Sequence, residues 1–183
     1  TKKLNIEQIH GKKLSYNNYN DIFSALTISK SLPNNIGTVI IKHANPCGVS
    51  INKNPLKSYQ SALKCDPISA FGGIVSCNFK IKRTLAKELS KIFLEVIVAN
   101  GFDNDSLKIL MKKKNLRLID ATKFFTKDII KFNSINDSIL TQSEDFKKFN
   151  VKDFEIVSKK RPNNSQLKNL IFAFNICRYV KSN

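Results

Sequence analysis

The chain has 183 residues, 42% of them hydrophobic, which is enough for one domain with a substantial core. Its 31 basic and 14 acidic residues give a formal net charge of +17. The lysines are scattered along the chain, which argues against a nucleic-acid binder and favours the attraction of small anionic substrates. No apolar run approaches the roughly 18 residues of a membrane-spanning helix.

The four cysteines, Cys47, Cys65, Cys77 and Cys177, are widely spaced and form no C-x-x-C pair. This spacing argues against a zinc site and a disulfide framework, and it indicates reduced thiols in the cytosol. The first residues lack the apolar stretch of a signal peptide. We therefore expect a cytoplasmic protein with no membrane partner.

In chain order, the first predicted elements are a short strand at residues 4–9 and a helix at 19–32. Asn17 and Asn18 are placed to cap that helix. The next segment, Thr38–Ile41, is apolar and mostly β-branched. It predicts a strand that is buried on both faces.

Two basic residues, Lys42 and His43, follow this strand directly, and a turn is predicted after them at 46–48. An imidazole transfers protons near neutral pH, and a lysine can stabilise negative charge or bind phosphate. Open sheets bind their ligands at strand ends, so we take this pair as the candidate site. A Lys-His dipeptide alone also allows a non-catalytic interpretation.

The stretch His43–Cys47 (HANPC) is similar to the H-x-E…P-C-x-x-C pattern of zinc nucleobase deaminases. The similarity fails at two positions that the chemistry requires. Asn45 stands where the pattern has its Glu acid/base, and Ser50 stands where it has its second Cys. We therefore expect no zinc.

A helix is predicted at 55–64, and the stretch 66–73 (DPISAFGG) then leads into a strand at 74–77. Adjacent glycines, Gly72 and Gly73, permit unusual backbone geometry and the close approach of a ligand. A tight turn without a ligand explains them equally well.

A strand is predicted at 94–98, and it carries Glu95. A carboxylate in a buried strand needs a partner or a function. The alternative is a solvated side chain at the edge of the sheet.

The other predicted elements are helices at 82–91, 106–113 and 166–180 and strands at 116–119, 139–142 and 154–158. The last two strands are expected to form a hairpin-like pair, and the inner face of the last helix is expected to be core. Strands that alternate with helices predict an α/β layer fold with a parallel or mixed sheet.

Five motifs occur in a recognisable order: LSYNN (14–18), KHANPCGV (42–49), DPISAFGGIV (66–75), EVIVA (95–99) and VKSN (180–183). Together they resemble the transformylase part of the bifunctional purine-biosynthesis family that combines AICAR transformylase with IMP cyclohydrolase. The resemblance spans nearly the whole chain. It implies formyl transfer from 10-formyltetrahydrofolate to the 5-amino group of AICAR.

The resemblance also implies roles for individual residues. His43 matches the proton acceptor, Lys42 the residue that stabilises the transition state, and Asn183 an asparagine near the transferred formyl group. Glu95 matches an acidic position that binds AICAR, and Gly72 matches a backbone contact to it.

Two further residues belong to the implied AICAR site. Phe71 precedes the Gly72 contact, and Asn17 lies in a motif near the same site. The implied fold is cytidine deaminase-like, a three-layer sheet with flanking helices and no zinc. The implied assembly is a homodimer with shared active sites, and a structural potassium ion is left open.

The resemblance identifies residues 1–183 as the first subdomain of the transformylase domain. The cyclohydrolase domain and the second transformylase subdomain are not found in it. We therefore expect a fragment of a larger enzyme that does not turn over on its own. A non-catalytic AICAR-binding module is the alternative, and a nucleic-acid binder is a third interpretation.

Overall fold

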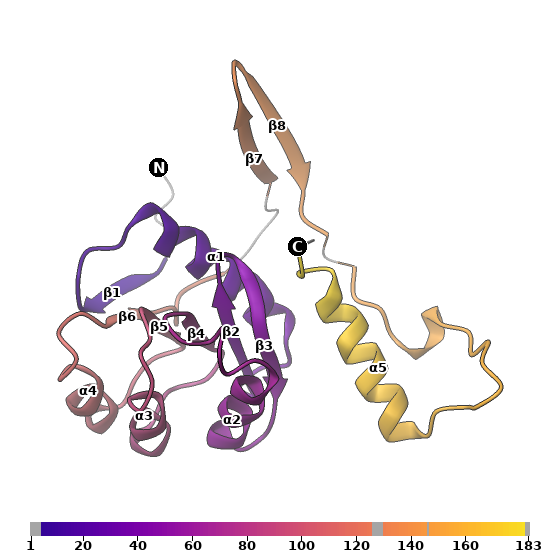
Figure 1. Ribbon diagram of the computed structural model, residues 1–183, viewed down its shortest axis with the longest axis horizontal. Coiled ribbons are helices and arrows are strands. Elements are labelled where there is room, and N and C mark those ends of the chain that lie inside the picture. Colours follow the sequence, from indigo (N-terminus) through magenta and orange to yellow (C-terminus); the bar gives the residue numbers. More distant parts are fainter. Residues whose placement is uncertain (1–4, 126–129, 146, 182–183) are drawn as a thin grey trace. The chain divides into compact units, whose positions relative to one another are not determined.

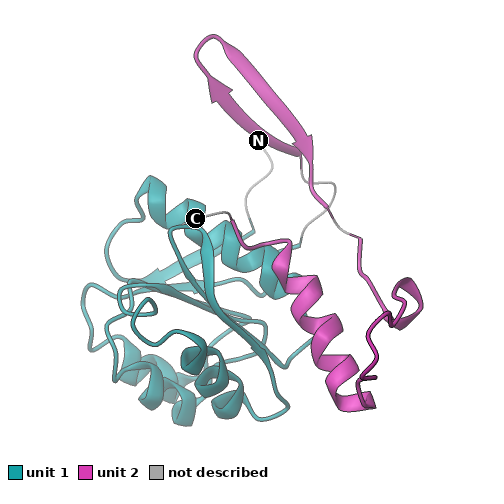
Figure 2. Ribbon diagram, turned by 45° about the vertical axis from the view of Figure 1, so that its right-hand side comes forward, with its two compact units in different colours: residues 1–125 teal, residues 126–183 magenta. Residues whose placement is uncertain are grey.

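The computed structural model describes residues 5–125, 130–145 and 147–181. The chain divides into two units, Thr1–Phe125 (unit 1) and Thr126–Asn183 (unit 2) (Figure 2). In the part of the chain that the structure describes, no helix is long and apolar enough to cross a membrane.

Unit 1 is built on a six-stranded mixed sheet in the order β1-β6-β5-β4-β2-β3. Strands β4, β5 and β6 are parallel, whereas β2 runs antiparallel to β3 and β4, and β1 runs antiparallel to β6. The strands are β1 (Glu7–His10), β2 (Gly37–Lys42), β3 (Asn45–Ile51), β4 (Ile74–Cys77), β5 (Val96–Ala99) and β6 (Arg117–Asp120). The predicted α/β fold with a mixed sheet is confirmed.

Helices cover both faces of this sheet (Figure 1). Helix α1 (Tyr16–Ser31) covers one face, and α2 (Pro55–Cys65), α3 (Arg83–Leu89) and α4 (Asn104–Leu110) cover the other. Successive side chains of a strand point to opposite faces, so the central strands are buried on both sides. All four residues of β4 and of β5 are buried, as is β2 up to Ile41.

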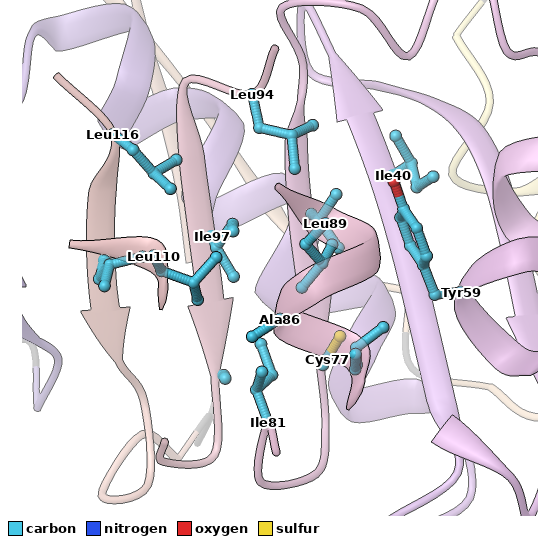
Figure 3. Packing of buried hydrophobic residues seen from close by; sticks show 14 of the residues in the cluster. Ile40, Tyr59, Cys77, Ile81, Ala86, Leu89, Leu94, Ile97, Leu110 and Leu116 are labelled. Carbon is cyan, nitrogen blue, oxygen red and sulfur yellow. The ribbon is translucent and has the colours of Figure 1, made fainter. Parts of the chain in front are cut away.

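The main core lies between the sheet and the helices α2, α3 and α4 (Figure 3). Tyr59 of α2, Leu89 of α3 and Leu110 of α4 pack there against strand residues that include Ile40 and Ile97. This layer fixes the strand ends that carry the candidate site.

Helix α1 begins three residues earlier than predicted, because its cap is Ser15 and not an asparagine. The Ser15 hydroxyl accepts a hydrogen bond from the Asn18 N–H at 3.2 Å, and the Asn18 side chain accepts one from the Ser15 N–H at 3.1 Å. This reciprocal capping box satisfies two backbone donors at the helix start. Asn17 lies exposed in the first turn of the helix.

The turn predicted at 46–48 is wrong, because the chain reverses earlier, at His43 and Ala44. Pro46 and Gly48 lie within β3, which pairs with β2 and is an edge strand of the sheet that the described residues form. An edge strand tolerates proline, and the pairing register shifts at this point, as in a β-bulge. Gly48 is needed because a Cβ there would lie 2.0 Å from the Ala62 carbonyl oxygen of α2.

Unit 2 contains a two-stranded hairpin, β7 (Ile130–Ile135) and β8 (Ser138–Ser143), a short 3-10 helix η1 (Val151–Asp153) and the helix α5 (Asn164–Cys177). The predicted strand at 154–158 is therefore wrong, and β8 pairs with β7. Phe154 instead packs edge-on against Phe174 of α5, with ring centroids 4.9 Å apart. This packing explains the apolar pattern of the segment.

The expectation that the inner face of α5 is core is also wrong. Every residue of α5 is at least partly exposed, including Leu170 and Phe174. Together with 154–158, the helix lines an apolar groove of about 310 Å³. The apolar residues at helical spacing in α5 therefore line this groove and do not form a buried core.

Candidate functional site

The candidate pair lies at the tip of the β2–β3 hairpin. Lys42 is the last residue of β2, and its Nζ donates a hydrogen bond to the Phe71 carbonyl at 3.0 Å. His43 is exposed, and its φ is +54°, while φ of Ala44 is +56°. Positive φ at both central residues is the requirement of a type I′ hairpin turn. The tight turn therefore presents the imidazole to solvent beside a lysine whose amine is anchored.

The second part of the site is the loop that precedes β4. Asp66 accepts a hydrogen bond from the Ser69 N–H at 2.9 Å, and hydrogen bonding by Ser69 lowers the pKa of the Asp66 carboxyl. Gly72 has φ +74°, and its N–H donates to the Phe93 carbonyl at 2.9 Å. The rings of Phe71 and Phe93 are 5.4 Å apart and both are at least half exposed. The loop thus sets an open aromatic surface beside a glycine backbone.

Glu95 lies next to this loop, immediately before β5 and not inside the strand as predicted. Its N–H donates to the Gly73 carbonyl at 3.1 Å, and its side chain is 43% exposed. Because water reaches the Glu95 carboxylate, it does not require a partner to offset the desolvation cost of a buried charge. Specific side chains nevertheless contact it.

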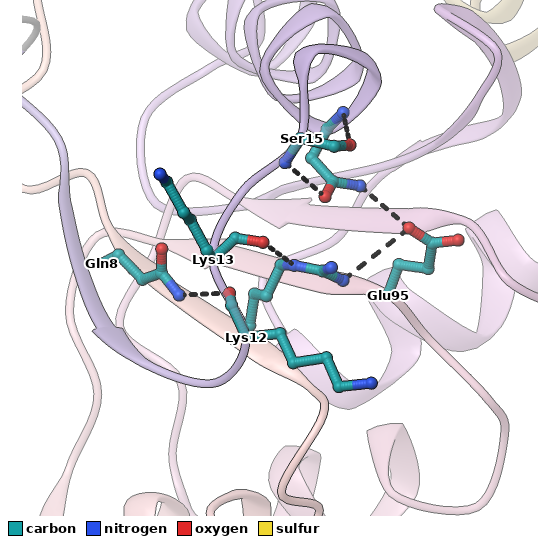
Figure 4. A network of polar contacts seen from close by, with 7 residues as sticks. Gln8, Lys12, Lys13, Ser15 and Glu95 are labelled. Carbon is teal, nitrogen blue, oxygen red and sulfur yellow. Dashed lines mark hydrogen bonds and ion pairs between the residues drawn. The ribbon is translucent and has the colours of Figure 1, made fainter.

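Those partners form a polar network (Figure 4). The Asn18 side-chain amide donates to Glu95 Oε2 at 2.8 Å, and Arg117 Nη1 lies 3.8 Å from the same oxygen. Arg117 Nε also donates to the Lys13 carbonyl at 3.2 Å, which ties the strand β6 to the segment before α1. Both contacts reach one carboxylate oxygen and so orient the carboxylate of Glu95.

The structure brings Lys42, Phe71, Gly72 and Glu95 to one end of the sheet, with His43 beside Lys42. The last residues of β2 lie there beside the first residues of β4 and β5, because β2 runs antiparallel to β4 and β4 runs parallel to β5. These predicted residues therefore share one edge of unit 1.

Of the other predicted residues, Asn17 is not part of that group. Asn17 is exposed, and the residue that contacts Glu95 is its neighbour in the sequence, Asn18. Asn183 lies outside the described residues.

Sequence reasoning missed two residues of this edge, Asp21 and Arg117. Arg117 begins β6 as Glu95 precedes β5, and the parallel pairing sets Arg117 opposite Val96. A charged residue at the start of two consecutive parallel strands was the available signal. Asp21 accepts a hydrogen bond from the Ala44 N–H at 2.7 Å, a contact that no sequence spacing indicates.

The site offers acid–base and electrostatic chemistry more readily than thiol chemistry. Burial, followed by the charge of Asp66, raises the pKa of the Cys47 thiol, so this thiol stays protonated near neutral pH. Within residues 5–125, 130–145 and 147–181, no group of three or more His, Cys, Asp or Glu side chains can hold a metal ion. The groups at hand are an imidazole, an amine, a carboxylate and a guanidinium.

The family model described as AICARFT/IMPCHase bienzyme matches residues 1–183. The bifunctional purine biosynthesis protein PurH of Caldicellulosiruptor saccharolyticus is 42% identical over 180 residues, which cover 98% of this chain and 35% of that protein. PurH of Clostridium kluyveri is 41% identical over 176 residues, and PurH of Leptospira biflexa is 38% identical over 182 residues. These matches cover 96% and 99% of this chain, and 34% and 35% of those relatives.

The chain thus spans about a third of the length of these relatives. The match of the family model over residues 1–183 and the relatives at about 40% identity agree with each other. The chain belongs to the AICARFT/IMPCHase bienzyme family.

Proposed function

We propose that unit 1 binds AICAR at the edge formed by Lys42, His43, Gly72 and Glu95, and serves formyl transfer from 10-formyltetrahydrofolate in purine biosynthesis. One observation carries the proposal: Lys42, Phe71, Gly72 and Glu95, to which the family resemblance assigns roles, lie at one end of the sheet in unit 1. The names of the relatives support the place in purine biosynthesis.

The reaction explains why these groups are needed. The 5-amino group of AICAR is a poor nucleophile, because its lone pair is conjugated with the ring. As it attacks the formyl carbon, His43 accepts its proton, and Lys42 stabilises the negative charge that develops on the formyl oxygen. The bond from the formyl carbon to N10 of the folate then breaks, and N10 leaves with the proton that His43 took from the amine, which returns His43 to its starting state.

Glu95, Phe71 and Gly72 position AICAR in this proposal. The Glu95 carboxylate, oriented by Asn18 and Arg117, accepts hydrogen bonds from the amino groups of AICAR. The exposed Phe71 ring offers a face for the imidazole ring. Asn183 is proposed to act beside the formyl group, as the family resemblance implies.

Three finer expectations belong to the same proposal. Helices on both faces of a mixed sheet support a cytidine deaminase-like fold. The exposed apolar residues of unit 2 support a homodimer. Because the relatives are about three times as long as the match, we propose that residues 1–183 alone do not formylate AICAR. Sedimentation of the chain and an assay of its turnover test the last two points.

A hybrid enzyme tests the catalytic assignment. Residues 1–183 replace the matched segment of the C. saccharolyticus relative, and formylation of AICAR is measured. His43→Ala is expected to lower kcat at least about 100-fold, the scale of losing a general base. His10→Ala is the control, because the His10 ring contacts the Lys113 carbonyl at 3.2 Å and has no role in the proposed reaction. A near-normal rate for His43→Ala contradicts the proposed role.

A further inference from the structure

The turn that carries His43 has an unusual sequence for its conformation. Both central residues, His43 and Ala44, have positive φ, at +54° and +56°. Turns of this kind strongly prefer Asn-Gly, since a side chain is strained in the left-handed region. Neither residue is glycine, so the surrounding structure must hold the turn in place.

Helix α1 supplies a group that does this. The Asp21 carboxylate accepts a hydrogen bond from the Ala44 N–H at 2.7 Å, the short distance of a charge-assisted bond. Asp21 is half-buried, and Ala44 is 3% exposed. The flanking residue Ile22 is fully buried against the sheet, which fixes the helix from which the carboxylate reaches the turn.

We infer that Asp21 is a positioning residue, which holds the His43–Ala44 turn in its left-handed conformation and thereby sets the place of the His43 imidazole. The importance of that imidazole rests on the proposed function. Asp21 itself does not meet the reactants and acts through the backbone of Ala44. The hydrogen bond between Asp21 and Ala44 thus connects the hairpin turn that carries His43 to helix α1, which packs on one face of the sheet.

The turn itself is tested in residues 1–183 without any ligand, by amide hydrogen exchange and the NMR signals of the His43 ring. Asp21→Ala is expected to speed exchange of the Ala44 amide roughly tenfold or more, since hydrogen bonds to charged groups are among the stronger ones. The His43 ring signals should move as well. Asp21→Asn keeps an acceptor oxygen but loses the charge, so its Ala44 amide should exchange at a rate between those of the unmodified chain and Asp21→Ala.

A second change separates the hydrogen bond from the conformation. Ala44→Gly makes positive φ unstrained, so the double variant Asp21→Ala/Ala44→Gly should regain the original His43 ring signals while its amide still exchanges fast. An unchanged exchange rate of the Ala44 amide in Asp21→Ala overturns the inference. Faster exchange of this amide without any change in the His43 ring signals also overturns it. If Asp21→Ala does not fold, recovery of the fold in the double variant supports the inference, and failure to recover it overturns the inference.

The AICAR ribonucleotide then connects the turn to the proposed site. Titration should shift the signals of both His43 and Gly72 in the unmodified chain, but only those of Gly72 in Asp21→Ala. The double variant should respond at both places. A full His43 response in Asp21→Ala overturns the positioning role. Absence of any response in the unmodified chain contradicts the proposed function, whereas the exchange and ring signals still decide whether Asp21 holds the turn.

Discussion

Glu95 immediately precedes β5, and Arg117 begins the neighbouring parallel strand β6. Their side chains therefore lie side by side. Their separation of 3.8 Å, with Glu95 43% exposed, indicates an orienting contact and not a strong stabilising one. The shorter bond from Asn18 to the same oxygen fixes the carboxylate further. The network therefore orients the Glu95 carboxylate and adds little to the stability of the fold.

Glu95→Ala is expected to weaken AICAR binding by roughly tenfold or more, because hydrogen bonds to a charged acceptor are lost. Titration calorimetry of the AICAR ribonucleotide on residues 1–183 measures this change. Glu88→Ala is the control, since Glu88 on α3 forms a separate pair with Lys91. Equal affinity in the Glu95 and Glu88 variants would remove Glu95 from the site.

At the scale of elements, the sequence predicted most of unit 1. Strand β4 has its predicted bounds, and β2, α2 and β6 are shifted by one residue at the ends that differ. These elements were predictable because β-branched runs and caps are local signals: Thr38–Ile41 consists of β-branched residues, and Pro55 occupies the first turn of its helix.

The errors arose where distant contacts decide the structure. The position of the hairpin turn depends on Asp21, on a bulge and on the edge position of β3, and a short sequence window contains none of these. The strand predicted at 154–158 failed for a related reason: Phe154 packs against the distant Phe174 and does not lie in a strand pair. The convergence of Lys42, Gly72 and Glu95 followed only from the family resemblance until the sheet order was known.

Gly48 gives a test at this scale, because β3 approaches α2 closely there. Gly48→Ala sets a Cβ 2.0 Å from the Ala62 carbonyl, and this overpacking is expected to cost about 1–3 kcal/mol of unfolding free energy. Urea denaturation measures the loss. Ser61→Ala, on the exposed side of α2, should change stability by less than about 0.5 kcal/mol. A Gly48→Ala chain as stable as Ser61→Ala would contradict the described packing.

At the scale of the whole molecule, the core contains two titratable groups with no part in the site. Burial raises the pKa of Tyr59 from 10.0 to about 12 and that of Cys77 from 9.0 to about 12. Both groups are neutral in the fold at neutral pH, so neither buries a charge there. Their contribution to stability is complete below the unfolded values and is lost as the pH rises towards 12.

Stability should therefore fall between pH 9 and pH 12, as measured by urea denaturation at several pH values. Tyr59→Phe should reduce the fall that begins near pH 10, because it removes one of the two groups. The same change should not destabilise the chain at neutral pH, since the buried hydroxyl has no hydrogen-bond partner among the described residues. An unaltered alkaline profile in Tyr59→Phe would contradict the assignment.

The two units offer different candidate surfaces for a ligand. Unit 2 has the apolar groove of about 310 Å³, whereas unit 1 has an open edge with an imidazole, an amine and a carboxylate. AICAR is a polar, anionic ribonucleotide, so its chemistry favours the edge of unit 1. A net charge of +17 further favours the approach of an anion.

The most direct measurement is therefore a titration of isotope-labelled residues 1–183 with the AICAR ribonucleotide, followed by NMR. We expect shifts that cluster at Lys42–Ala44, at Phe71 and Gly72, and at Glu95. The groove residues Leu170 and Phe174 should remain unshifted. Shifts confined to the groove, or none at Lys42–Ala44, Gly72 and Glu95, would contradict the binding of AICAR by unit 1.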